Sequence, residues 1–179
     1  EQNETTQRIG KFVARLIQDG DTIQVGYGGL PNAVLANLYD KRHLGVHTEL
    51  FSDGLVDLIR AGVIDNSRKT LSPGKIIAAF CMGKKSTYEF LNDNPSVLFR
   101  TIDHTNNPLN IARQKNMVAI NSALEIDLTG QATSDSIGGT FYSGVGGHQD
   151  FMRGALLAEG GRTILAMKST AIKDTVSRI

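Results

Sequence analysis

Apolar positions along the chain recur at two alternating spacings, a helical one of three to four residues and a strand-like one of two. Ile9, Phe12 and Leu16 give a clear example of the helical spacing. This spacing predicts helices over residues 7–18, 31–39, 55–62, 86–92, 108–114 and 148–161. Short apolar runs between them predict strands over residues 21–26, 46–50, 75–81, 97–102 and 162–169, with two short strands or one bent strand in 117–130.

Residues with special backbone preferences mark several ends of these elements. Gly20 is expected to stop the first helix, and Pro31 suits a first turn because its missing N–H costs nothing there. Asp53 is expected to cap the third helix, which closes at Gly62. A long glycine-rich loop, residues 135–147, precedes the last helix.

Strands that alternate with helices in this way indicate crossover units and parallel pairing. The fold class predicted for residues 1–179 is a single three-layer α/β domain, with a mainly parallel sheet and helices on both faces. A chain of 179 residues fits one domain.

Composition narrows the class of protein. At 40% hydrophobic and 21% charged residues the chain is an ordinary soluble globular one, and its net charge of +1 argues against a nucleic-acid partner. The single cysteine, Cys81, cannot form an internal disulfide, which favours a reducing compartment. No apolar run approaches the length of a membrane span, so we expect a cytoplasmic protein without membrane attachment.

Ligands of parallel α/β folds lie beyond the carboxyl ends of the strands. This rule singles out residues 26–31, 49–54 and 144–150, which are also the most unusual stretches of the sequence. The first of them, GYGGLP, stands where a dinucleotide-binding G-x-G-x-x-G would stand, and Glu49 lies near the place of the ribose-binding acid. Pro31 weakens the nicotinamide interpretation because it replaces the glycine that permits close helix–strand packing.

Other chemistries fit these glycines and the acid. The amides of Gly26, Gly28 and Gly29 could stabilise an oxyanion or cradle a phosphate, while a tight turn alone explains one or two of the three. A glutamate at a strand end is usually a solvated charge, yet a desolvated Glu49 near oxyanion donors could attack an acyl carbon.

Further candidates follow the later strands. Gly144, Gly146 and Gly147 directly precede a helix, so their amides add to its N-terminus, although a flexible loop explains them equally well. Asn106 and Asn107 could cap a helix or bind a ligand. The histidines have no metal-binding spacing, so we expect structural or surface roles and no metal: His43, His47, His104 and His148.

Four motifs occur in order along nearly the whole chain from about residue 19: VGYGGLPNAV, GVHTELFSDG, NSALEIDLTGQ and GVGGHQDFMRGA. Together they closely resemble the acetyl-CoA hydrolase and 4-hydroxybutyrate CoA-transferase family of class I CoA-transferases. The resemblance implies a CoA-transferase-like, Rossmann-like topology. It also implies that Glu49 attacks an acyl-CoA thioester, and that the reaction passes through an acyl-glutamyl anhydride and a glutamyl-CoA thioester.

The resemblance assigns further roles to residues of this chain. It implies that Gly146 and Gly147 are oxyanion donors and that Asn106 is the active-site asparagine. The remaining glycines of the motifs would line the site for CoA and the acyl group: Gly26, Gly28, Gly29 and Gly144. His148 stands where many relatives carry a different residue.

The implied substrates are a short-chain acyl-CoA (4-hydroxybutyryl-, butyryl- or acetyl-CoA) and a carboxylic acid such as acetate. Coenzyme A enters as a substrate, with no permanently bound cofactor. Family members also have an N-terminal lobe, so the chain is expected to be the C-terminal lobe of a longer two-lobe, homodimeric transferase, trimmed at both ends. Two alternatives remain: an acetyl-CoA hydrolase with the same nucleophile, and a non-catalytic CoA- or nucleotide-binding module.

Overall fold

The computed structural model describes residues 3–172 and 174–179. Four parallel strands form its central sheet, in the order β12-β7-β1-β2. Thr22 starts the central strand and pairs with Met117 on one side and Gly45 on the other. These strands are β1 (Thr22–Val25), β2 (Gly45–Val46), β7 (Met117–Asn121) and β12 (Arg162–Leu165).

Two further parallel pairs lie beyond β2. Strand β4 (Ile76–Ala78) pairs with β6 (Val97–Phe99), and β3 (Leu50–Phe51) pairs with β5 (Phe80–Cys81). A single parallel bridge between His47 and Ile77 connects the first of these pairs to the end of β2. The expected mainly parallel sheet is therefore confirmed.

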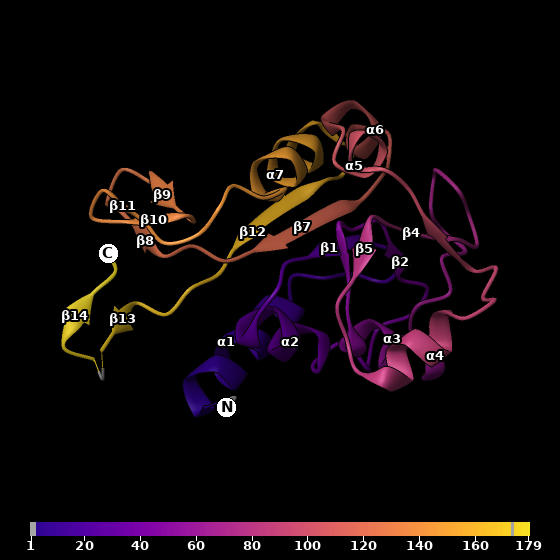
Figure 1. Cartoon of the computed structure of the whole chain (residues 1–179), viewed down its shortest axis with the longest axis horizontal. Helices are drawn as coiled ribbons and strands as arrows, with labels where there is room; N and C mark the ends of the chain where they lie inside the picture. The colour runs from indigo at the N-terminus through magenta and orange to yellow at the C-terminus, as the bar shows by residue number, and fades with distance from the viewer. Residues whose placement is uncertain (1–2, 173) are drawn as a thin grey trace.

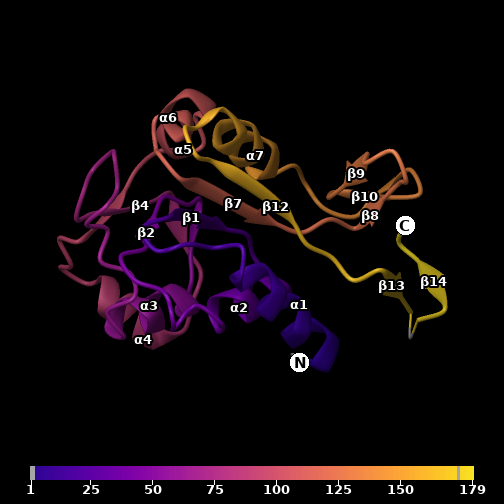
Figure 2. The ribbon, with the colours of Figure 1, turned by 180° about the vertical axis from the view of Figure 1, so that it is seen from behind.

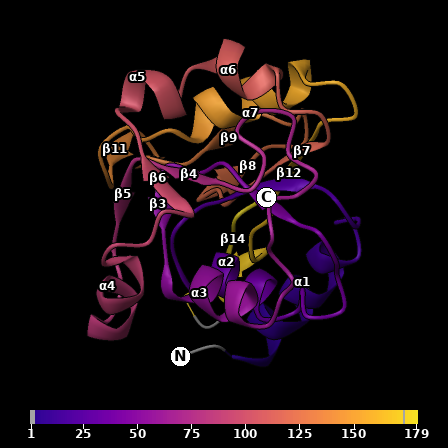
Figure 3. The same ribbon diagram turned by 90° about the vertical axis from the view of Figure 1, so that its right-hand side faces the viewer.

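Helices lie on both sides of the strands (Figures 1 and 3). In Figure 1, α5, α6 and α7 lie above β7 and β12, whereas α1 to α4 lie below the strands. None of the helices that the described residues form is long and apolar enough to cross a membrane. The helices are α1 (Glu4–Ala14), α2 (Gly29–Leu35), α3 (Asp53–Arg60), α4 (Lys85–Leu91), α5 (Ile102–Thr105), α6 (Pro108–Ala112) and α7 (His148–Leu157).

Strand β7 shows why both faces of the sheet are covered. Val118 and Ile120 point into the larger apolar core, which they share with the residues of α1, α2 and α3. Met117 and Ala119 point the other way, into a smaller core formed with Phe151 of α7. Because successive side chains of a strand face opposite sides, an uninterrupted apolar run is what a strand covered on both sides requires.

Three short antiparallel pairs follow the carboxyl ends of β7 and β12 and extend away from the sheet (Figures 1 and 2). Two of them precede α7, but only the pair β10–β11 lies in the stretch 135–147 where the sequence suggested a glycine-rich loop; Gly138 and Gly139 make its turn with φ values of 54° and 86°. The pairs are β8 (Glu125–Ile126) with β9 (Ala132–Thr133), β10 (Ser136–Ile137) with β11 (Thr140–Phe141), and β13 (Thr170–Ala171) with β14 (Val176–Ser177).

Several expected boundaries are wrong for identifiable reasons. The first helix covers residues 4–14, not 7–18: the side chain of Asn3 accepts a hydrogen bond from the amide of Thr6 and starts it early, and the helix ends at Ala14, well before the expected stop at Gly20. The strand expected over residues 97–102 ends at Phe99, and α5 follows it. The strand expected over residues 46–50 divides into β2 and β3.

Asp53 caps a different helix from the expected one. Ser52 occupies the N-cap position of α3, and Asp53 is the first residue of that helix. The Asp53 carboxylate accepts hydrogen bonds from the amide of Lys84, at the N-cap of α4, and from Thr87 Oγ1, at 2.9 and 2.5 Å. These bonds, the Thr87 one foremost, lower the pKa of Asp53 and connect α3 to α4.

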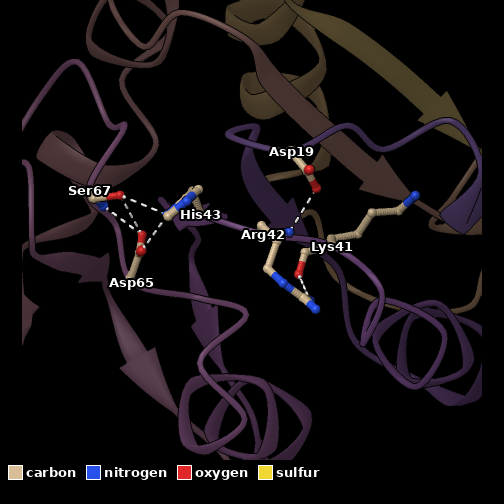
Figure 4. A network of polar contacts seen from close by, with 6 residues as sticks. All are labelled: Asp19, Lys41, Arg42, His43, Asp65 and Ser67. Carbon is tan, nitrogen blue, oxygen red and sulfur yellow. Dashed lines mark hydrogen bonds and ion pairs between the residues drawn. The ribbon is translucent and has the colours of Figure 1, made fainter.

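A polar network holds the segment that enters β2, on the side away from the carboxyl ends of the strands (Figure 4). The amide of Arg42 donates to Asp19 Oδ1 at 2.7 Å. Asp65 accepts a hydrogen bond from Ser67 Oγ and lies 2.7 Å from His43 Nδ1. The entry into β2 is therefore fixed by exposed polar contacts, while its carboxyl end carries the candidate chemistry.

Candidate active site

Glu49 lies in the break between β2 and β3, where the backbone passes from one strand pairing to another. The amide of His47 donates to Ile23 O of β1, and the amide of Thr48 donates to Ile77 O of β4. The carbonyl of Glu49 accepts hydrogen bonds from the amides of Ala79 and Phe80, at 2.9 and 3.1 Å. The backbone of Glu49 is therefore held on both sides, which fixes where its side chain starts.

One oxygen of the Glu49 carboxylate carries two hydrogen bonds. Asn106 Nδ2 and the amide of Gly147 each lie 3.0 Å from Glu49 Oε2. Among the residues that the structure describes, none donates a hydrogen bond to the other oxygen, Oε1. Charge-assisted bonds of this kind orient a carboxylate strongly, so Oε2 is fixed and Oε1 is left available to react.

A cavity of about 260 Å³ opens beside this carboxylate. Glu49, Gly26, Gly147 and the side chains of Phe80 and Met82 are part of its lining. A second cavity of about 720 Å³ adjoins it and shares four of its lining residues: Gly26, Tyr27, Asn121 and His148. The Glu49 carboxylate therefore has a small cavity beside it and a larger one next to that.

The structure brings some of the predicted site residues together and separates others. Glu49, Asn106 and Gly147 meet in one cluster, although they come from three distant parts of the chain. Asn107, the other asparagine considered, caps α6 by accepting a hydrogen bond from the amide of Leu109. The expected capping role is therefore confirmed for Asn107, whereas Asn106 ends α5 and directs its side chain to Glu49.

The other predicted glycines lie farther from the carboxylate. Gly26 lines both cavities, whereas Gly144 and Gly146 line only the larger one. Gly28 is the N-cap residue of α2, and its φ of 125° explains why a glycine stands there. Gly29 is the first residue of α2 and lines neither cavity. Turn geometry thus accounts for Gly28.

A reciprocal pair of amides was missed by the sequence patterns. Gln24 Nε2 donates to Asn121 Oδ1 at 3.2 Å, and Asn121 Nδ2 donates to Gln24 Oε1 at 2.9 Å. Both side chains are buried, lie at the carboxyl ends of β1 and β7, and line the smaller cavity. The available signal was a polar residue inside each of two otherwise apolar strands, since buried amides need hydrogen-bond partners.

Lys69 is a second group that the patterns missed. Its side chain is buried, and Nζ donates to the carbonyls of Val46 and Lys75 at 2.8 and 2.6 Å. Burial lowers the pKa of Lys69 to about 7. A neutral amine keeps two N–H groups, so both hydrogen bonds survive deprotonation and continue to support the end of β2.

Two histidines lie beside the Glu49 cluster. His47 is almost fully buried, its ring meets the edge of Phe151 at 6.0 Å, and burial lowers its pKa to about 4. His148 is half-buried and lines both cavities, with Nδ1 2.8 Å from Ser134 Oγ, and burial also lowers its pKa. No group of three metal-ligating side chains occurs within residues 3–172 and 174–179.

The buried His47 predicts a pH dependence of stability. An unfolded histidine binds a proton near its ordinary pKa of 6.5, whereas folded His47 resists protonation down to about pH 4. His47 therefore does not change the free energy of unfolding above pH 6.5, and it lowers this free energy by up to roughly 3 kcal/mol as the pH falls from 6.5 to 4. Urea unfolding at pH 7 and pH 4.5 measures this loss. His47→Gln is expected to lose less stability over the same interval, and an identical loss in both proteins would contradict the assignment.

Comparison with known proteins identifies the relatives of this site. Residues 83–179 match the family model "Acetyl-CoA hydrolase/transferase C-terminal domain", a segment that includes Asn106 and Gly147. A 4-hydroxybutyrate coenzyme A transferase from Clostridium kluyveri is 53% identical over 96% of this chain and 40% of its own length. The chain thus spans about 40% of the length of the first curated relatives that it matches.

Solved structures give the same relationship. The crystal structure of RipA from Yersinia pestis is 48% identical, with a TM-score of 0.91 over 97% of this chain and 39% of that protein. A 4-hydroxybutyrate CoA-transferase from Porphyromonas gingivalis is 44% identical, with a TM-score of 0.88 over 97% of this chain and 41% of that protein.

Proposed function

The chain belongs to the acetyl-CoA hydrolase/transferase family, and on this premise we propose that it carries the nucleophile of an acyl-CoA:carboxylate CoA-transferase. The proposed substrates are a short-chain acyl-CoA, such as 4-hydroxybutyryl-, butyryl- or acetyl-CoA, and a carboxylic acid such as acetate. The relative from Clostridium kluyveri, named as a 4-hydroxybutyrate coenzyme A transferase, supports transfer over hydrolysis.

The observation that carries this proposal is the double hydrogen bond to Oε2 of Glu49, a residue that lines a cavity. In the first step Oε1 attacks the thioester carbon, the C–S bond breaks, and CoA leaves as a thiolate. The product is a mixed anhydride of Glu49 and the acyl group. The thiolate then attacks the Glu49 carbonyl carbon, releases the acyl group as a carboxylate, and leaves a glutamyl-CoA thioester.

The second half of the reaction reverses these steps with another acid. The incoming carboxylate attacks the glutamyl thioester and expels the CoA thiolate, which then attacks the new acyl carbon and regenerates Glu49. Whenever a thiolate or carboxylate adds to the Glu49 carbon, negative charge develops on Oε2. Asn106 Nδ2 and the Gly147 amide already lie 3.0 Å from that atom, so they are in place to stabilise the charge.

The proposal also covers a second lobe of the protein, its oligomeric state and its location. The known relatives are longer, and a second α/β lobe is proposed to close over the cavities, where the apolar side chains of Tyr27, Phe80 and Met82 are exposed. The three-layer arrangement, a homodimeric state, a cytoplasmic location and the absence of a permanently bound cofactor are proposed with it. The helices on both sides of the sheet support the three-layer part.

Chemical trapping tests the proposal. The full-length protein is incubated with butyryl-CoA, treated with borohydride and digested. Reduction of a glutamyl thioester to an alcohol is expected to change the mass of the peptide that contains Glu49. An unchanged peptide in a protein that turns over acyl-CoA would rule out this nucleophile.

The acceptor distinguishes transfer from hydrolysis in the same preparation. Consumption of butyryl-CoA that requires added acetate and yields acetyl-CoA and butyrate is the result expected of a transferase. Equal release of free CoA without any acid indicates a hydrolase, and binding of CoA with no turnover indicates a non-catalytic module.

A further inference from the structure

The amide of Asn106 is held at both ends. Its Nδ2 donates to Glu49 Oε2 at 3.0 Å, and its Oδ1 accepts a hydrogen bond from Thr105 Oγ1, also at 3.0 Å. Asn106 is 6% exposed and Thr105 is fully buried. Water therefore has little access to replace either hydrogen bond.

The orientation of this amide decides what Glu49 meets. A rotation of the amide by half a turn changes its shape little but exchanges oxygen and nitrogen. After such a rotation, Oδ1 would face the carboxylate, and two hydrogen-bond acceptors would repel each other. Glu49 selects the correct orientation as long as Oε2 only accepts hydrogen bonds, and it does so most strongly as a carboxylate, because charge-assisted hydrogen bonds are stronger than neutral ones.

The hydroxyl of Thr105 supplies a selection that is independent of Glu49. Thr105 Oγ1 lies 3.0 Å from Asn106 Oδ1 and 3.3 Å from Thr101 O. A hydroxyl has a single proton, and the shorter distance assigns it to Asn106. With its proton on Asn106 Oδ1, the hydroxyl favours the oxygen of the amide toward Thr105 and the N–H groups toward Glu49; a flipped amide would have to donate to Oγ1 and move the hydroxyl proton to the longer contact with Thr101 O.

His47 fixes the backbone of the same segment. Its Nε2 lies 2.8 Å from the carbonyl of Thr105, and a carbonyl only accepts, so this ring nitrogen carries the hydrogen. Its other nitrogen, Nδ1, is buried without a hydrogen-bond partner in the part of the chain that the structure describes. The imidazole also packs against Phe151 of α7, the helix whose N-cap is Gly147. One side chain thus touches both segments that donate to Glu49.

We propose that Thr105 and His47 are positioning residues for the CoA-transfer reaction, acting on Glu49 through Asn106. Thr105 sets which end of the Asn106 amide faces the carboxylate, and His47 holds the Thr105–Asn106 backbone at the required distance. The inference rests on the proposed function. It implies that the hydrogen bond from Asn106 Nδ2 to Glu49 Oε2 persists when Oε2 becomes a carbonyl oxygen in the anhydride and the thioester. At that stage Oε2 is a neutral carbonyl oxygen and a weaker acceptor than a carboxylate oxygen, so the orientation of the amide depends more on Thr105.

A matched pair of substitutions at Thr105 isolates the hydroxyl. Thr105→Val removes the hydroxyl and keeps the shape, whereas Thr105→Ser keeps the hydroxyl and removes a methyl group. In the full-length protein Thr105→Val is expected to lower kcat about tenfold, with KM for butyryl-CoA changed less than about twofold, because one hydrogen bond in the transition state is weakened. Thr105→Ser is expected to stay within about threefold of wild-type kcat, despite its smaller volume.

Two more variants complete the test. His47→Gln retains a donor near the Nε2 position and is expected to keep more kcat than His47→Leu. Gln114→Met is the control for loss of a buried polar side chain, because Gln114 is fully buried and its hydrogen bonds go to Thr70 and Leu71. It is expected to lower the Tm and to leave kcat near wild type.

The outcomes separate this inference from the proposed function. Wild-type kcat in Thr105→Val overturns the inference, as does an equal loss of kcat in Thr105→Val and Thr105→Ser. A loss in Gln114→Met as large as that in Thr105→Val also overturns it, because general destabilisation then explains the effect. A wild-type protein without turnover of acyl-CoA instead overturns the proposed function.

Discussion

Replacing Glu49 with glutamine is expected to reduce CoA transfer by the full-length protein by about a thousandfold or more. Glutamine has nearly the same shape and still offers an oxygen to Asn106 Nδ2 and the Gly147 amide, which lie 3.0 Å from Oε2. It lacks the negative charge of the carboxylate, and an amide nitrogen takes the place of Oε1, the oxygen that is proposed to attack. The folded structure should therefore survive while the covalent chemistry stops.

The measurement is the rate of acetyl-CoA formation from butyryl-CoA and acetate, together with the Tm of each protein. Glu49→Asp should also lose about a hundredfold, because shortening the side chain moves the attacking oxygen by roughly one ångström. Glu89→Gln is the matched control, since Glu89 is an exposed acid on α4 that pairs with Lys85. A Glu49→Gln variant that keeps a tenth of the wild-type rate would exclude Glu49 as the nucleophile.

The order of strands and helices could be predicted from the sequence because buried parallel strands carry continuous apolar runs. Residues 117–121 of β7 show this most clearly, since both faces of the strand are covered. The break between β2 and β3 could not be predicted in this way. VHTEL alternates like one strand, but His47 and Thr48 turn their amides to partners on two different strands, Ile23 and Ile77. Long-range pairing decided the local structure there.

The candidate site was predictable where chemistry and chain position coincided. Glu49 follows β2, and the carboxyl ends of parallel strands are where ligands of such folds lie, whereas Asn106 ends α5 and Gly147 begins α7. Which of several neighbouring groups faces the carboxylate depends on distances in the folded structure, and the spacing of residues along the sequence does not give these distances. Gly146 and Gly147 look alike in the sequence, yet only the amide of Gly147 donates to Glu49.

The supporting residues were the hardest to predict. His47 and Gln24 are polar residues in apolar surroundings, and their partners, Thr105 and Asn121, lie 58 and 97 residues away. A local pattern assigns such residues to the surface, because isolated polar side chains are usually exposed. Their burial becomes intelligible only when the partner that satisfies the hydrogen bond is known.

The difference between the two adjacent glycines gives the second large expected effect. A Cβ atom on Gly147 would overlap Glu49 Oε2 and Asn106 Nδ2, whereas one on Gly146 would meet no heavy atom within 4 Å. Gly147 has a φ of −76°, so alanine fits the backbone conformation there and the obstacle is the close approach alone. Gly147→Ala should displace the carboxylate from its donors and lower kcat about a hundredfold.

Gly146→Ala is the matched comparison, because it adds the same methyl group one residue earlier and keeps its own N–H. It is expected to retain kcat within about threefold, since the added atom has space. Both variants should melt within a few degrees of the wild type, because the collision in Gly147→Ala is with two polar side chains, of which Glu49 lines a cavity, and not with the apolar core. Equal kcat values for the two variants would mean that the contact between the Gly147 backbone and Glu49 Oε2 does not control the reaction. A selective loss in Gly147→Ala would instead assign the oxyanion function to the single amide at residue 147, and not to the glycine-rich segment as a whole.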